Sequence, residues 1–230
     1  MSSDLEFLGL VADGEPGRYR FTVQNHLARL DARLYGGTAI AVSLAAAELV
    51  SERAPLWMPT QFVSTAPADA EIAVHAEVLA PGRRTNQVRV TATDAAGEIM
   101  FASLGATGRP REEGLTGPFE HPPVVTPPAE SEPRGGPFTT MLRNAGITDV
   151  PPLPQGIGFA SVVEFREPEV LSHPDPGPGR ICMWVRRKDS VPLTPATVAF
   201  IADMVPLSVA HGAGLVAGGI SLDNTIRVGA

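Results

Sequence analysis

The hydrophobic positions of this chain follow two different periods, and they predict an alternation of strands and helices. Residues 18–24 alternate polar and apolar side chains, as a strand with one buried face does. After the stretch at residues 34–38, an alanine-rich run continues to Glu52, and Ile40, Leu44, Ala47 and Ser51 recur in it at helical spacing. We expect a long helix there, because small side chains let a helix lie close against another backbone layer.

After residues 53–55 the period changes to two, which predicts a meander of antiparallel strands. Asp, Gly and Pro residues separate the apolar runs and are typical of tight turns. The expected strands span residues 58–65, 70–79, 85–93 and 98–105. A strand, a long helix and a meander of strands make an α+β unit, which we place at residues 1–108.

A proline-rich segment follows, and after it the same order of elements begins again. Residues 109–154 lose the apolar period and are predicted to form a connector. Residues 155–230 repeat the pattern, with a helix that begins at Thr194–Pro195, runs toward residue 212 and kinks or weakens at Pro206. The expected strands of this second unit span residues 158–165, 181–188 and 219–228. The second unit has fewer strands after its helix than the first, so we expect either a missing tail or completion by another subunit.

Composition and charge narrow the classes of function. The chain has 18 Lys and Arg against 25 Asp and Glu, and its net charge of −7 argues against a nucleic-acid partner. Its apolar stretches are shorter than the roughly 18 to 20 residues of a membrane span, and it shows no secretory signal, so we expect a cytoplasmic protein. The single cysteine and the five dispersed histidines lack the spacing of a metal site, so we predict neither metal nor cofactor.

Asp203 is the most informative residue, because it lies within the apolar run of residues 198–205. A helix that is apolar on every side is normally buried, and burial raises the pKa of a carboxyl group. Such a group suits a general base that acts near neutral pH. A structural hydrogen bond between helix and sheet would explain the same residue equally well.

Two further features are candidates for a site. Ser221, Asp223 and Thr225 would share one face of a strand, where they would orient a water molecule or a substrate, or simply face solvent. Gly36 and Gly37 begin the first predicted helix and would present backbone N–H groups to an oxyanion. Short basic clusters at residues 83–84 and 186–188 would suit phosphate groups or ordinary solvated surface.

These residues resemble the bacterial acyl-CoA thioesterase II family, the TesB-like enzymes. Residues 31–38, with the sequence Asp-Ala-Arg-Leu-Tyr-Gly-Gly-Thr, resemble the N-terminal half of that family. Residues 200–204 and 219–227 resemble its C-terminal half, with an aspartate on the helix and Ser-Leu-Asp-Asn-Thr on the strand that follows. The resemblance covers both units, which a variable connector joins.

The resemblance implies a double hotdog fold, in which two long helices are each wrapped by a curved antiparallel sheet. It also implies hydrolysis of an acyl-CoA thioester, in which an Asp, a Thr or Ser and a Gln hold the attacking water. Asp203 matches the Asp and Ser221 matches the Thr or Ser, whereas the Gln belongs to a later strand that this chain does not contain. Gly36 and Gly37 match the turn near the first helix and are predicted to contact substrate.

The expected partners are an acyl-CoA substrate in fatty acid metabolism and further copies of the chain, because hotdog units usually pair into homo-oligomers. A non-catalytic acyl-CoA or lipid-binding protein is the alternative, since the Gln is missing and Ser replaces the more usual Thr. A hydratase of the same fold would need a histidine in the two C-terminal stretches that carry the resemblance, and they contain none.

Overall fold

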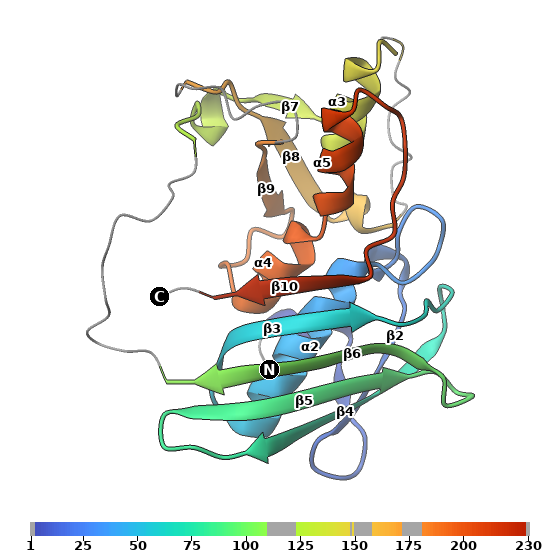
Figure 1. Cartoon of the computed structure of the whole chain (residues 1–230), viewed down its shortest axis with the longest axis vertical. Helices are drawn as coiled ribbons and strands as arrows, with labels where there is room; N and C mark the ends of the chain where they lie inside the picture. The colour runs from blue at the N-terminus through green and yellow to red at the C-terminus, as the bar shows by residue number, and fades with distance from the viewer. Residues whose placement is uncertain (1–2, 110–122, 148, 150–157, 172–180, 229–230) are drawn as a thin grey trace.

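The computed structural model describes residues 3–109, 123–147, 149, 158–171 and 181–228 (Figure 1). In chain order the helices, 3-10 turns (η) and strands are α1 (Ser3–Leu8), β1 (Val11–Ala12), β2 (Arg18–Thr22), η1 (Asn25–Leu27), α2 (Gly36–Ser51), β3 (Ala54–Phe62), β4 (Glu71–Ala80), β5 (Thr85–Thr93), β6 (Ile99–Gly108), η2 (Pro128–Glu130), β7 (Glu132–Arg134), α3 (Pro137–Asn144), η3 (Phe159–Ser161), β8 (Val163–Glu167), β9 (Trp184–Arg187), α4 (Pro195–Ala202), α5 (Val205–Gly212) and β10 (Asp223–Arg227).

The first half of the chain folds as its hydrophobic pattern predicts, with one long helix against an antiparallel sheet. The sheet has seven strands in the order β1-β2-β4-β5-β6-β3-β10. It lies across α2, which passes behind β3, β5 and β6 in Figure 1. β3 begins at Ala54, earlier than expected, and β6 continues to Gly108.

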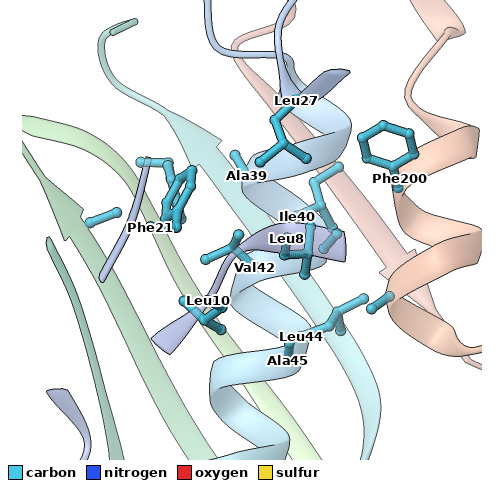
Figure 2. Packing of buried hydrophobic residues seen from close by; sticks show 14 of the residues in the cluster. Leu8, Leu10, Phe21, Leu27, Ala39, Ile40, Val42, Leu44, Ala45 and Phe200 are labelled. Atoms are coloured by element: carbon cyan, nitrogen blue, oxygen red, sulfur yellow. The ribbon is translucent and has the colours of Figure 1, made fainter. Parts of the chain in front are cut away.

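The main hydrophobic core lies between this sheet and α2. All residues of α2 from Gly37 to Ala47 are buried, because β3 to β6 cover the helix on one side and α4 packs against another. Figure 2 shows Val42 beside Phe21 and Leu10, whereas Phe200 of α4 approaches α2 near Ile40. The predicted role of the small side chains is therefore confirmed, since they let strands and a second helix approach α2 closely.

A strand from the second half of the chain completes the edge of the first sheet. β10 pairs with β3 in antiparallel register, with Asn224 opposite Thr60 and Thr225 opposite Pro59. The backbone N–H of Phe62 also donates to the carbonyl of Leu222 at 2.9 Å. This pairing places residues 222–227 beside the strand that follows α2.

The rest of the second half is less regular than predicted. The stretch expected as a strand at 158–165 begins with η3 before β8, and the strand expected at 181–188 is limited to β9. β7 lies in the predicted connector, yet it pairs with β8 in a three-stranded sheet of order β7-β8-β9. Residues 110–122, 148 and 150–154 of the connector lie outside the described residues, and the domain boundaries stay a prediction.

The helix expected to continue from residue 195 toward 212 is two helices, α4 and α5, separated at Asp203 and Met204. The helix start at Thr194 is confirmed, since the Thr194 side chain accepts the backbone N–H of Thr197 at 3.0 Å. Among the described residues, none of the helices combines the length and the apolar content that crossing a bilayer requires.

Candidate active site

The interruption between α4 and α5 defines the candidate site. In a continuous helix the N–H of residue 206 would donate to the carbonyl of Ala202, but Pro206 has no N–H. The helix therefore ends at Ala202, and Asp203 lies at its end with φ −80° and ψ 60° instead of inside it. This corrects the sequence-based picture of Asp203 as a residue surrounded by helix, and it frees the Asp203 backbone for other partners.

The Asp203 carboxylate is held by groups from two distant parts of the chain. Asn224 Nδ2, on β10, donates to Asp203 Oδ1 at 2.8 Å. The backbone N–H of Gly37, in the first turn of α2, also donates to the carboxylate. The positive end of the α2 dipole thus faces a negative charge, which is the favourable arrangement at a helix N-terminus.

Gly36 and Gly37 have no room for a side chain. A methyl group on Gly36 would overlap Asp203 Oδ2 and lie 3.0 Å from the ring of Phe62. A methyl group on Gly37 would overlap the backbone carbonyl of Phe200. The glycine pair is therefore what lets α4 and the carboxylate come so close to the start of α2.

The environment changes the acid–base behaviour of Asp203. Burial raises the pKa of the Asp203 carboxyl above its ordinary value, and the hydrogen bonds from Asn224 and Gly37 offset only part of that rise. Burial removes water that would stabilise the anion, whereas the two donors stabilise it. The result is a carboxylate that is a stronger base than a solvent-exposed aspartate, as the sequence-based hypothesis for Asp203 requires.

Tyr35, the residue directly before α2, also contacts Asp203. Its hydroxyl donates to the backbone carbonyl of Asp203 at 3.0 Å. Its ring stacks on Phe159 with 4.2 Å between centroids and meets the edge of Phe200 at 5.5 Å. Burial, and to a smaller extent the charge of Asp203, raises the pKa of Tyr35 well above its ordinary value, so the hydroxyl remains a donor.

Ser221 is half-buried just before β10, and Asp223 and Thr225 are exposed. The residues of β10 that turn inward are Asn224 and Ile226. The hydrogen bond to Asp203 therefore comes from Asn224, which sequence reasoning did not select. The period of two could have found it, because Asn224 shares a face with the apolar Ile226.

The basic cluster at residues 186–188 makes contacts within the protein. Arg186 pairs with Glu164, and the Lys188 ammonium donates to the carbonyl of Ser161 at 2.8 Å. Arg187 is buried, where its guanidinium pairs with Asp4 and Asp189. Within the described residues, no group of three or more His, Cys, Asp and Glu side chains is arranged to hold a metal ion.

Part of the chain is similar in sequence to a known protein family. Residues 27–107 match the family described as the acyl-CoA thioesterase N-terminal domain. Among curated proteins, no match to the chain was found. The matched residues contain α2 and most of the sheet that covers it, together with Gly36 and Gly37.

Solved structures show the same fold. A presumed thioesterase from Novosphingobium aromaticivorans is 28% identical, and the match covers 95% of this chain and 79% of that chain with a TM-score of 0.74. A protein of unknown function with a hotdog fold, from Alicyclobacillus acidocaldarius, is 20% identical over 99% of this chain and 78% of that chain, with a TM-score of 0.77. The tesB protein of Mycobacterium avium subs paratuberculosis is 19% identical over 99% of this chain and 79% of that chain, with a TM-score of 0.65.

These likenesses extend beyond the matched domain into the second half of the chain. They confirm the predicted hotdog fold and the predicted resemblance to TesB-like proteins. Residues 27–107 of this chain are therefore similar to the acyl-CoA thioesterase N-terminal domain, and the chain as a whole has a fold similar to that of the tesB protein of Mycobacterium avium subs paratuberculosis.

Proposed function

We propose that this protein hydrolyses a fatty acyl-CoA thioester to the free acid and CoA, with Asp203 as the general base. The observation that carries the proposal is the Asp203 carboxylate, half-buried, held by Gly37 and Asn224 and raised in pKa. The family match over residues 27–107 supports an acyl-CoA thioester as the substrate class. The likeness to a presumed thioesterase at 28% identity supports the same reaction.

In the proposed reaction, Asp203 takes a proton from a water molecule while the water oxygen attacks the carbonyl carbon of the thioester. The electron pair of the carbonyl double bond moves to its oxygen and gives a tetrahedral intermediate. When that double bond re-forms, the carbon–sulfur bond breaks and the CoA thiolate leaves. The proton held by Asp203 passes to the thiolate, so the enzyme returns to its starting state without a covalent intermediate.

The other candidate residues have supporting parts in this proposal. Asn224 and the Gly37 N–H orient the carboxylate, because each donates to it directly. We assign to Ser221 a hydrogen bond to the attacking water, since it lies half-buried two residues before β10. Gly36 and Gly37, at the positive end of α2, would contact the substrate next to Asp203.

The proposed setting is a cytoplasmic homo-oligomer that takes part in fatty acid metabolism. Acyl-CoA as the proposed substrate supports the location and the metabolic role. The exposed edge strand β10 supports association, because an edge strand carries unpaired backbone groups.

The test is thiol release from acyl-CoAs of short to long chain length by wild type, Asp203→Asn and Asp223→Asn. The exposed Asp223 lies on β10 and serves as the matched control. We expect Asp203→Asn to lose at least about a hundredfold in kcat, because the variant keeps the shape and removes the base. Asp223→Asn should retain the wild-type rate. Wild-type protein that binds acyl-CoA with turnover at the background rate would overturn hydrolysis and leave the acyl-CoA-binding function.

A further inference from the structure

The interruption at residue 203 removes helical hydrogen bonds from the backbone that carries the carboxylate. Nearby N–H groups bond locally, from Met204 to the carbonyl of Ala202 at 2.8 Å and from Leu207 to the carbonyl of Met204 at 3.1 Å. The carbonyl of Asp203 receives the hydroxyl of Tyr35 instead. A segment without regular helical bonds keeps its conformation only where other contacts fix it.

Tyr35 is itself held firmly. Its backbone N–H donates to the carbonyl of Leu27 at 3.1 Å, and its own carbonyl accepts the N–H of Thr38 at 3.0 Å. Its ring is stacked on Phe159 with 9° between the ring planes. The residue is buried, with 4% of its surface exposed. Its hydroxyl therefore occupies a fixed point in the core.

Tyr35 and Gly37 contact the same residue at two different groups. The Tyr35 hydroxyl binds the backbone of Asp203, and the Gly37 N–H binds its carboxylate. Two attachments to one rigid helix start limit the rotation of Asp203 about its own backbone. Asn224 supplies the third attachment from β10.

We propose that Tyr35 is a positioning residue, whose hydroxyl fixes the backbone at Asp203 so that the carboxylate stays aligned with Gly37 and Asn224. This inference rests on the proposed function of the Asp203 site. Tyr35 acts through Asp203 and needs no contact with the substrate. Loss of its hydroxyl lets the interrupted segment shift, and a shift of about 1 Å at a reacting group can cost on the order of a hundredfold in rate.

The experiment compares Tyr35→Phe with Tyr19→Phe. Phenylalanine keeps the stacked ring of residue 35 and removes only the hydroxyl. Tyr19 is the other of the two tyrosines in the chain, lies half-buried on β2, and serves as the matched control. The first readout is the amide NMR signal of Gly37 followed against pH, because its hydrogen bond to the carboxylate makes the signal report the protonation of Asp203. The Asp203→Asn variant identifies that titration by removing it.

We expect Tyr35→Phe to reduce the pH-dependent shift of the Gly37 signal at least about twofold, and Tyr19→Phe to leave it unchanged. The second readout is acyl-CoA hydrolysis, in which Tyr35→Phe should lower kcat about tenfold and change KM less than about twofold. A Tyr35→Phe variant with the full Gly37 shift, or with wild-type kcat, would overturn the positioning role. If wild-type protein hydrolyses no acyl-CoA, the proposed function fails, and the Gly37 signal alone decides the role of Tyr35.

Discussion

The two central helices of this protein differ in continuity, and that difference separates scaffold from candidate chemistry. α2 runs from Gly36 to Ser51 without interruption, and the sheet and α4 cover it. α4 ends after eight residues, buries Ala199 and Phe200 on one face and leaves Val198 40% exposed. A continuous buried helix satisfies its own backbone, whereas an interrupted one leaves groups available for partners outside the helix.

The polar side chains of the two helices also differ in what they bond to. On α2, Ser43 donates to the carbonyl of Ala39 at 2.9 Å and accepts the hydroxyl of Ser103 at 2.8 Å. Ser103 lies 2.8 Å from the hydroxyl of Thr60, so these buried hydroxyls bond to one another. At the end of α4, by contrast, the polar group is the half-buried Asp203 carboxylate, whose pKa is raised. The bonded hydroxyls of Ser43, Ser103 and Thr60 stabilise the core. The Asp203 carboxylate can instead take up and release a proton.

Among the substitutions that test the contact between the start of α2 and the end of α4, Gly36→Ala should lower the activity most, because it forces these two helix ends apart. The added methyl group would overlap Asp203 Oδ2 and crowd Phe62, so we expect at least about a hundredfold loss of kcat. Gly218→Ala is the control, because no atom lies within 4 Å of the position its methyl group would take. Thiol-release kinetics measure both variants. Wild-type kcat in Gly36→Ala would show that the close contact between the start of α2 and Asp203 is not needed for the reaction.

Pro206→Ala tests the interruption itself. Alanine restores an N–H that can bond to the carbonyl of Ala202, so α4 and α5 should join and move Asp203 away from its partners. We expect about a tenfold loss of kcat together with more helical signal in circular dichroism. Pro195→Ala is the matched control, because the N–H at the first position of a helix has no helical partner. Added helix with unchanged activity would show that the interruption is not needed.

Asn224→Ala should change the pH dependence of activity. Asn224 lowers the pKa of Asp203, so its removal raises that pKa further above the ordinary value. Because a general base must be deprotonated, the acidic limb of kcat/KM should move to higher pH, and the severalfold loss of activity should shrink as pH rises. The control is Thr225→Ala, at an exposed neighbouring position. If the acidic limb of kcat/KM in Asn224→Ala stayed at the wild-type pH, Asn224 would have no influence on the base.

Ser43→Ala should have the smallest effect on activity and act on stability. It leaves the buried Ser103 hydroxyl without one partner, so the free energy of unfolding should fall by about 1–3 kcal/mol. Ser51→Ala removes a similar bond to the carbonyl of Ala47 at the half-buried end of α2 and should cost less. Denaturant unfolding measures both. A large loss of kcat in Ser43→Ala would mean that α2 takes part in the chemistry beyond its first turn.

Local patterns predicted several helices and strands well. α2, β5 and the start of α4 lie where apolar spacing and capping residues place them, because these signals act over a few residues. The position of β7 was missed, since Glu132–Arg134 carries no apolar alternation and forms a strand only through pairing with β8. Strand formation of this kind depends on the partner more than on the segment itself.

The candidate site was predicted in part. Asp203, Gly36 and Gly37 were selected separately, each for its residue type and its apolar or helical context, and the structure brings them together. Asn224 was missed, although the period of two places it on the same face as Ile226, because its partner Asp203 lies 21 residues away in the sequence. Tyr35 was noted only as part of the stretch before the helix, since its bond to Asp203 spans 168 residues.

The sequence by itself determined the main elements of the first half and their order, the weak point of the second helix near Pro206, and the presence of an isolated acid in an apolar run. These properties follow from side-chain periodicity and from the loss of a backbone donor at Pro206, which are local. Only the tertiary structure decided that the start of α2, the end of α4 and β10 meet at one carboxylate. That meeting depends on the pairing of β10 with β3 and on the packing of α4 against glycines of α2, and long-range contacts of this kind are specified by the whole core and not by any one segment.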